Sequence, residues 1–337
     1  EDALANQLIP VQRIGLADIA ESPIDWMHVA PHTLNYQLKK ATKYGLREHQ
    51  KLAISRITEG FATHDRGTWV SACGTGKTFT SLKLAEQLCA ANGGHLKVLF
   101  LAPSISLVSQ SLREWMAQSQ TDIRPFIVCS DSKAGRQAED ITTHDIPLPT
   151  TDAARLTKNL AGVGRRARGM TVVFSTYQSI DVVAQAQKDA TAEFDLILCD
   201  EAHRTTGVKL PGEADESSFV KVHDNAYLPA AKRLYMTATP RIYGEAVKKK
   251  ADEASAVLTS MDDEDLFGPE FHRLGFGEAV EARLLSDYKV MVLVVEGDAI
   301  AESLQRSLAS DSELTLDDAA KIVGCWNGLA KRTQDGF

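Results

Sequence analysis

The segment SACGTGKT, residues 71–78, constrains the fold of this chain more than any other stretch. It follows the apolar pair Trp69-Val70 and precedes a stretch with helical spacing. In a strand–loop–helix context such glycines let backbone N–H groups turn toward an anion, and the helix directs the positive end of its dipole at the same point. The alternative is a plain glycine turn before a basic helix start, and Ser71 stands where the strict phosphate-loop pattern has glycine. The candidate nucleotide-binding residues here are Cys73, Gly74, Thr75, Gly76, Lys77 and Thr78.

Short apolar runs before and after this loop indicate buried strands, and helical patterns lie between several of them. One helical pattern starts at Leu46, a second contains Leu82, and a third contains Trp115. Buried strands that alternate with helices are typical of βαβ units, so we predict an α/β fold with a mainly parallel sheet and helices on both faces. The predicted strands are 68–72, 97–102, 125–129, 171–175, 195–199 and 233–237.

The 337 residues exceed what one hydrophobic core usually supports, so we expect one complete domain and part of another. The chain lacks an initiator Met, and we expect it to be a piece of a longer protein. The segment after 287 predicts a strand at 288–296 and helices at 298–309 and 316–332. The predicted divisions are a lead-in of short helices and loops (1–42), an ATP-binding domain (43–245) with an insertion at about 130–170, a charged linker (246–286) and the truncated start of a second domain (287–337).

The composition, 44% hydrophobic and 24% charged, is that of a soluble globular protein. The five cysteines are odd in number and lack a CxxC spacing, which argues against a disulfide framework or a zinc site and favours the cytoplasm. No apolar run reaches the roughly 18 residues of a membrane span, so we expect no membrane partner. The net charge of −8 excludes bulk attraction to nucleic acid but leaves room for local contacts.

A second signal, FDLILCDEAH at residues 194–203, decides in favour of the phosphate loop. It is an apolar strand that ends in adjacent carboxylates. Asp200 at the strand end is suited to holding Mg²⁺, together with the Thr78 hydroxyl, and Glu201 is suited to positioning or deprotonating a water. The alternative, a carboxylate pair that merely ends a strand, is weak beside a phosphate loop upstream.

These two motifs and three others arrive in the order typical of superfamily 2 helicases and translocases, which the chain resembles from about Leu46 to its end. LREHQ (46–50) resembles the adenine-reading motif, with Gln50 as the adenine contact. LAPSISLVSQ (101–110) and FSTYQS (174–179) resemble two strand-contacting motifs, and MTATPR (236–241) resembles the motif that couples hydrolysis to movement. The resemblance implies RecA-like domains.

Finer features narrow this resemblance to the motor of type I and especially type ISP restriction-modification enzymes. They are DEAHRTTG, RLYMTATPRIYGE, LFGPEFHRLGFGEAV and VGCWNGLAKR. The resemblance implies double-stranded DNA as partner, and nuclease and methyltransferase domains in the same longer polypeptide or complex. The chain itself shows neither a nuclease carboxylate-lysine cluster nor an Asn/Asp-Pro-Pro-Tyr motif.

The resemblance also implies roles for individual residues. Lys77, Asp200, Glu201 and His203 are the catalytic candidates, with ATP and Mg²⁺ as cofactors, and His203 is expected to link the DEAH motif to Thr237 and Thr239. Because the strand-contacting motifs follow strand ends, we expect DNA phosphate contacts from them, or hydroxyls that cap helices, or both. The candidates for these contacts are Ser104, Ser106, Thr176 and Gln178.

No stretch resembles the Gln-x-x-Gly-Arg-x-x-Arg arginine-finger motif, so we expect this chain to bind ATP but to hydrolyse it poorly. GVGRRARG (162–169) precedes the amino end of a strand, and we interpret it as a solvated basic loop, with a secondary DNA contact as the alternative. Cys73 is either a thiol that nucleotide protects or a buried, inert one. His28 and His32 flank Pro31 and are expected in a loop rather than at a metal, and Trp326 is expected in a core.

Three other functions stay open at this stage. One is an RNA helicase or chromatin-type remodeller, because the motifs do not distinguish DNA from RNA. A second is a phosphate-loop kinase of small molecules, which gives no reason for LREHQ, DEAH and TATP to occur together. The third is an ATP-switched clamp that never turns over its nucleotide.

Overall fold

The structure is a computed structural model that describes residues 43–129, 151–162, 168–191, 193–209, 218–253 and 256–287. The chain divides into two compact units between Leu285 and Ser286, and nearly all described residues belong to the first unit. The predicted lead-in, His28, His32, Trp326 and the predicted elements after 287 lie outside the described residues.

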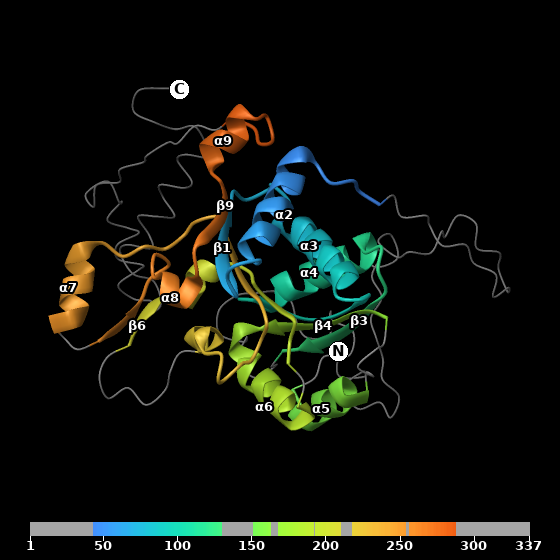
Figure 1. Cartoon of the computed structure of the whole chain (residues 1–337). Helices are drawn as coiled ribbons and strands as arrows, with labels where there is room; N and C mark the ends of the chain where they lie inside the picture. Colours follow the sequence, from blue (N-terminus) through green and yellow to red (C-terminus); the bar gives the residue numbers. More distant parts are fainter. Residues whose placement is uncertain are drawn as a thin grey trace, which may run out of the picture. The chain divides into compact units, whose positions relative to one another are not determined.

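A parallel seven-stranded sheet forms the centre of the first unit (Figure 1). The strand order is β3-β4-β2-β5-β7-β1-β9, and all six strands predicted from apolar runs are present. The prediction of a parallel, RecA-like α/β fold is therefore confirmed. The strands are β1 (Arg66–Ser71), β2 (His95–Ala102), β3 (Ile123–Val128), β4 (Gly169–Thr176), β5 (Leu196–Cys199), β7 (Arg233–Thr237) and β9 (Glu270–Leu274).

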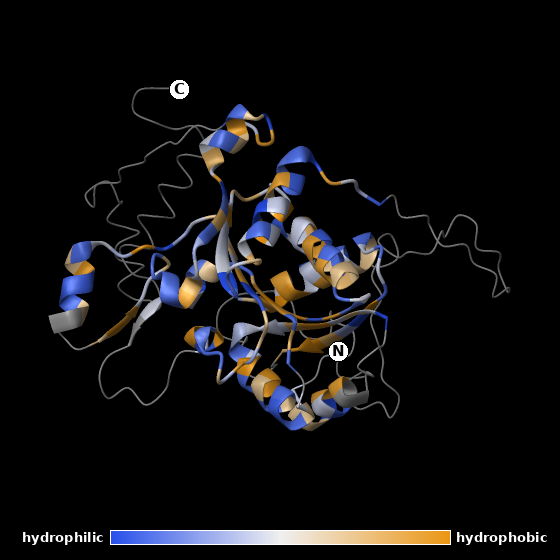
Figure 2. Cartoon of the chain, in the orientation of Figure 1, coloured by the Kyte–Doolittle hydropathy of each residue, from blue (hydrophilic) through white to orange (hydrophobic). Residues whose placement is uncertain are grey.

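Helices cover both faces of this sheet, which explains why its strands are continuous apolar runs (Figures 1 and 2). In β2, Val98 and Phe100 pack into one core while Leu99 and Leu101 pack into the other. The first core lies under α2 (Glu48–Gly60), α3 (Lys77–Ala91) and α4 (Ile105–Gln118), and the second lies under α5 (Ala153–Gly162) and α6 (Ile180–Ala190). No helix among the described residues has the length and apolar content to cross a bilayer.

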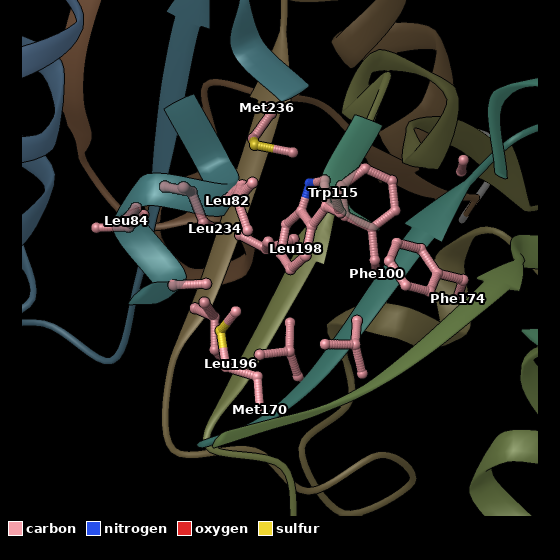
Figure 3. Close-up of a cluster of buried hydrophobic side chains, with 14 of the residues drawn as sticks. Leu82, Leu84, Phe100, Trp115, Met170, Phe174, Leu196, Leu198, Leu234 and Met236 are labelled. Carbon is pink, nitrogen blue, oxygen red and sulfur yellow. The ribbon is translucent and has the colours of Figure 1, made fainter. Parts of the chain in front are cut away.

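Aromatic side chains fill the centre of the first core (Figure 3). The Trp115 ring lies 5.7 Å from the rings of both Phe100 and Phe174, centroid to centroid, in edge-to-face geometry. Truncating a buried ring of this size costs about 3–5 kcal/mol. The Trp115 indole N–H also donates to the Thr78 carbonyl at 3.1 Å, so the same side chain holds the start of α3.

The segment predicted as a linker, 246–286, contains the edge strand β9, which the sequence analysis missed. The strand is half-exposed and carries charged residues, so it lacks the apolar run by which the other strands were recognised. The Phe271 ring of β9 packs directly on Gly67 of β1, where a Cβ would come within 2.3 Å of the ring. This close contact holds β9 against β1. The segment also contains α7 (Glu245–Glu253), α8 (Glu264–Phe267), α9 (Phe276–Glu281) and β8 (Val257–Thr259), which pairs antiparallel with β6 (Gly207–Lys209).

Candidate nucleotide and nucleic-acid site

The loop between β1 and α3 has the backbone that the glycine pattern predicts. Gly74 and Gly76 have φ angles of 82° and 85°, in the left-handed region that favours glycine. Gly76 caps the amino end of α3. The inner side of the loop is tied to β1, because the Thr75 hydroxyl donates to the Ala72 carbonyl at 2.7 Å and lies 2.8 Å from the Ser71 hydroxyl. The arrangement leaves the amino end of α3 turned toward the carboxyl edge of the sheet, where anions bind.

Lys77 and Thr78 begin the helix that follows this loop, and both are half-buried. The Lys77 ammonium donates to the Ser71 carbonyl at 3.0 Å. It therefore lies over the loop, within the space that a phosphate chain occupies in sites of this type.

Gln50 and His49, on the first turn of α2, contact the same loop. The Gln50 amide nitrogen lies 3.3 Å from the Thr75 carbonyl, and His49 Nε2 lies 3.1 Å from it. Gln50 is buried, and its amide oxygen accepts from the Arg47 backbone N–H at 2.9 Å. A Cβ at Gly76 would lie 2.7 Å from the Gln50 amide nitrogen, the end of a flexible side chain, so the positive φ rather than space favours glycine there. Sequence reasoning singled out Gln50 but missed His49.

Asp200 follows the last residue of β5 and is buried. Its backbone N–H donates to the Leu101 carbonyl at 2.8 Å, and the Tyr177 hydroxyl donates to the Asp200 carbonyl at the same distance. Burial raises the pKa of the Asp200 carboxyl to about 6; the neighbouring Glu201 also raises it, while the Lys77 ammonium lowers it. Lys77 and Asp200, far apart in sequence, thus lie close enough to act on each other's charge.

Glu201 adopts a left-handed backbone conformation, with φ 48° and ψ 46°. This conformation is uncommon for a residue other than glycine, and strain of this kind gathers at functional sites. Glu201 precedes the short 3₁₀ helix η6 (Ala202–Thr205), which contains His203. The Glu201 side chain is 27% exposed, so its carboxylate is accessible to solvent.

His203 joins the end of β5 to the end of β7. Its Nδ1 atom lies 3.0 Å from the Thr237 hydroxyl and 3.3 Å from a Glu201 carboxylate oxygen. The Thr237 hydroxyl also accepts from the Thr239 backbone N–H at 3.1 Å. Because β7 lies between β1 and β5 in the sheet, both threonines emerge between the phosphate loop and the DEAH segment.

Three cations surround His203. Burial lowers the pKa of the His203 imidazole, and Arg204, Arg241 and Lys77 lower it further, while Glu201 opposes them. His203 is therefore neutral at pH 7, which suits a hydrogen-bonding link between two motifs. Arg204 and Arg241, which the sequence analysis did not assign, bring positive charge to the open side of the site.

The candidate nucleic-acid contacts lie at the ends of the neighbouring strands β2 and β4. The Ser104 hydroxyl caps α4, accepting from the Leu107 N–H at 3.3 Å, and Ser106, two residues further on, is half-buried. Gln178 is exposed and its amide donates to the Pro103 carbonyl at 3.3 Å, which joins the two motifs. Thr176 is buried, and its hydroxyl donates to Ser179 at 3.2 Å. The structure thus presents Ser104, Ser106 and Gln178 at this edge, but not the Thr176 side chain.

The structure describes Cys73 and the two ends of the segment 162–169. Residues 163–167 lie outside the described residues, and Gly169 begins β4 at the amino edge, opposite the phosphate loop. Cys73 is exposed, so the interpretation of a buried, inert thiol is wrong.

No group of three or more His, Cys, Asp or Glu side chains with metal-ligand geometry occurs among the described residues. Mg²⁺ keeps several waters and takes few protein ligands, so Thr78 and Asp200 are residues that could hold it.

This fold and its loop define a class: a RecA-like domain with a phosphate-loop backbone and the motif order of superfamily 2. Residues 43–242 match the family model described as "Type III restriction enzyme, res subunit", and the chain belongs to that family. Residues 1–35 match a second model, described as "Restriction endonuclease". A search of curated proteins found no match.

Two solved structures of Type ISP restriction-modification enzymes resemble the chain. The ATP-dependent enzyme LlaBIII bound to DNA is 43% identical over 95% of this chain and 21% of its own, with a TM-score of 0.72. A nuclease-deletion mutant of LlaGI in complex with a DNA substrate mimic is 41% identical over 72% of this chain and 18% of its own, with a TM-score of 0.58. The chain therefore resembles the motor of these type ISP enzymes, and it spans about a fifth of their length.

Proposed function

We propose that this chain is the ATP-hydrolysing, DNA-translocating motor of a restriction-modification enzyme. The observation that carries the proposal is the order β5-β7-β1 in the parallel sheet, which brings the DEAH segment and the phosphate loop to the same edge. The Lys77 ammonium accordingly lowers the pKa of the Asp200 carboxyl. Lys77 holds the β and γ phosphates, Thr78 and Asp200 hold Mg²⁺, and Glu201 orients the attacking water. A Mg²⁺ ion held by Thr78 and Asp200 would supply positive charge to the transferred phosphoryl group. Cys73, Gly74, Thr75 and Gly76 surround the phosphates, and Gln50 reads adenine.

Double-stranded DNA is the proposed track. The relatives' structures are described as bound to DNA or to a DNA substrate mimic. Ser104, Ser106 and Gln178 lie along one edge of this domain, where they contact the phosphates of one strand without reading sequence. Thr176 supports this edge through Ser179 rather than by a direct contact.

We also propose that the motor works beside nuclease and methyltransferase domains, in the cytoplasm. The match of residues 1–35 to a restriction endonuclease model supports the nuclease, and the resemblance to type ISP enzymes supports both. A second RecA-like domain beginning near 287 remains part of this proposal, and the first domain includes β9 from the segment 246–286 that was predicted as a linker.

The 337-residue chain by itself is expected to bind Mg·ATP and to hydrolyse it slowly. No segment of the given 337 residues matches the Gln-x-x-Gly-Arg-x-x-Arg motif. An arginine finger is worth about 10³–10⁵ in rate in related phosphoryl transfers. DNA-stimulated turnover by this chain alone at the rate of a complete motor would contradict this expectation.

The variant Glu201→Gln tests the assignment as a hydrolase. It removes the carboxylate that orients water, so we expect single-turnover ATP hydrolysis to fall about a hundredfold or more, with the affinity for Mg·ATP changed by less than about twofold. Quenched-flow hydrolysis and titration with a fluorescent ATP analogue measure the two quantities.

The same measurements separate the alternatives. A clamp that never turns over shows no effect of Glu201→Gln on either quantity. A small-molecule kinase is stimulated by a metabolite rather than by DNA, and an RNA helicase by RNA rather than by duplex DNA. Any of these outcomes would overturn the proposal.

A further inference from the structure

A second hydrogen-bonded connection joins β7 to the DEAH segment, behind the contact between His203 and Thr237. The Tyr235 hydroxyl lies 2.8 Å from His223 Nδ1, and His223 Nε2 lies 3.1 Å from the Thr205 carbonyl. Tyr235 is two residues before Thr237 on β7, and Thr205 is two residues after His203 in η6. Both connections therefore join β7 to η6. The one through His203 and Thr237 lies at the candidate site, and the one through His223 is buried.

The chemistry of Tyr235, His223 and Thr205 fixes which atom donates in each hydrogen bond of this connection, which we call the His223 relay. A backbone carbonyl only accepts, so Nε2 of His223 carries the hydrogen that bonds to Thr205. Burial lowers the pKa of His223 to about 4, so the ring is neutral and Nδ1 has no hydrogen. Burial also raises the pKa of Tyr235, which keeps its hydroxyl protonated, and this hydroxyl therefore donates to Nδ1.

The surroundings of His223 hold it in one orientation. His223 ends the short 3₁₀ helix η7 (Val220–His223), and its carbonyl accepts from the Arg66 guanidinium at 3.3 Å. Its ring packs edge-on against Phe267 of α8, with centroids 4.6 Å apart. His223 is 6% exposed, and both Tyr235 and Thr205 are fully buried. Losing the hydrogen-bond donor to a buried carbonyl costs more free energy than losing the donor to an exposed one. The hydrogen bond from His223 therefore constrains the Thr205 carbonyl strongly.

We propose that His223 is a positioning residue for ATP hydrolysis: it holds the carboxyl end of η6 through Thr205, and so fixes Glu201 and His203 against the phosphate site. Thr205 itself ties back to the start of the helix, because its hydroxyl donates to the Ala202 carbonyl at 2.8 Å. Glu201, with its strained left-handed backbone, precedes that helix directly and depends on η6 for its orientation. The proposal rests on the hydrolase function proposed above.

Two substitutions separate the two hydrogen bonds of His223. A glutamine amide nitrogen overlies Nε2, so His223→Gln keeps the donor to Thr205 and loses the acceptor for Tyr235. The Asn amide oxygen overlies Nδ1, so His223→Asn keeps that acceptor and loses the donor. Both variants lose the ring and its packing against Phe267, so they form a matched pair.

Single-turnover hydrolysis of Mg·ATP by the full chain measures the effect. We expect the hydrolysis rate at saturating ATP to fall about tenfold in His223→Asn, with the half-saturating ATP concentration nearly unchanged, and to fall much less in His223→Gln. As a control for general destabilisation, Leu160→Ala opens the same core in α5, away from the site, and should lower the unfolding temperature without changing the rate. A parental rate in folded His223→Asn, or equal losses in both His223 variants, would overturn the proposal.

A spectroscopic measurement does not depend on turnover. In ¹⁵N-histidine NMR of the full chain, His223→Asn is expected to shift the His203 ring nitrogens, because η6 moves relative to Thr237. Unchanged His203 signals would count against the positioning role. If neither His223 variant folds, Tyr235→Phe removes a single oxygen and, like His223→Gln, keeps the donor to Thr205. A rate close to the parental one then supports positioning through Thr205, and a loss of tenfold or more overturns it. If the parental chain shows no hydrolysis at all while Lys77→Ala binds ATP equally well, the proposed function fails rather than this inference.

Discussion

The two edges of the parallel sheet differ in the side chains and helix ends that they bring together. At the carboxyl edge, the phosphate loop, Asp200, Glu201 and His203 come together from β1, β5 and the segments that follow them. At the amino edge lies a cavity of about 1020 Å³, between the starts of β2 and β5 and the carboxyl end of α6. Its lining includes His95, Lys97, Asp181, Gln187, Lys188, Glu193 and Asp195.

The cavity at the amino edge is therefore not where the proposed nucleotide site lies, although it is large. The strands β1, β2 and β4 lead from their carboxyl ends toward the amino ends of α3, α4 and α6, where free backbone N–H groups and a positive dipole favour phosphate. The amino edge receives the opposite, carbonyl ends of the helices, and its acidic and basic side chains are interspersed. Comparing matched substitutions at the two edges tests this difference directly.

The largest effect is expected from the lysine pair. Lys77→Ala removes the ammonium beside Asp200, and we expect ATP turnover to fall by about a hundredfold or more. Lys97→Ala at the amino edge should leave turnover unchanged. Hydrolysis assays on both variants check the comparison, and equal losses would show that the carboxyl edge has no special role.

A smaller effect is expected from pH. Mg²⁺ needs the Asp200 carboxylate, whose pKa is raised to about 6, so protons compete with the metal below that pH. We expect the Mg²⁺-dependent affinity for ATP to fall by up to about tenfold per pH unit as the pH drops below 6. Asp200→Asn should abolish this dependence and Asp195→Asn, at the amino edge, should keep it; a flat profile in the parental chain would contradict the assignment of Asp200.

The pH dependence of stability has the opposite sign. The folded chain holds the Asp200 proton more tightly than the unfolded chain does, so the stabilisation from that proton is present below the ordinary aspartate pKa. It is lost as the pH rises through about 6. In the nucleotide-free chain, Asp200→Asn should remove this contribution to the free energy of unfolding.

The smallest effect is expected at Cys73. It is exposed within the phosphate loop, whereas Cys89, Cys129 and Cys199 are buried. We expect a maleimide to label Cys73 first, to block nucleotide binding, and to react severalfold more slowly when Mg·ATP is bound. Peptide mass spectrometry identifies the labelled cysteine, and equal labelling with and without ATP would place Cys73 away from the nucleotide.

Much of the site could be predicted from sequence because its chemistry is local. Lys77 and Thr78 are adjacent to the glycines that shape the loop, and Asp200 and Glu201 end an apolar strand, so residue type and spacing indicate their roles. Thr176 shows the limit of such reasoning, since its motif is recognisable but its hydroxyl is buried against Ser179. His49 has no motif signal by itself, and its contact with Thr75 depends on how α2 packs.

The sequence by itself determined which segments are buried strands and helices, because apolar periodicity reports burial along one stretch of chain. Only the tertiary structure decided the strand order, which places β7 between the phosphate loop and the DEAH segment, and the edge position of the half-exposed β9. It also decided the relay through His223, whose partners Tyr235 and Thr205 lie on separate elements. Such pairings depend on long-range packing and on the desolvation that comes with it, and a linear pattern of residue types records neither.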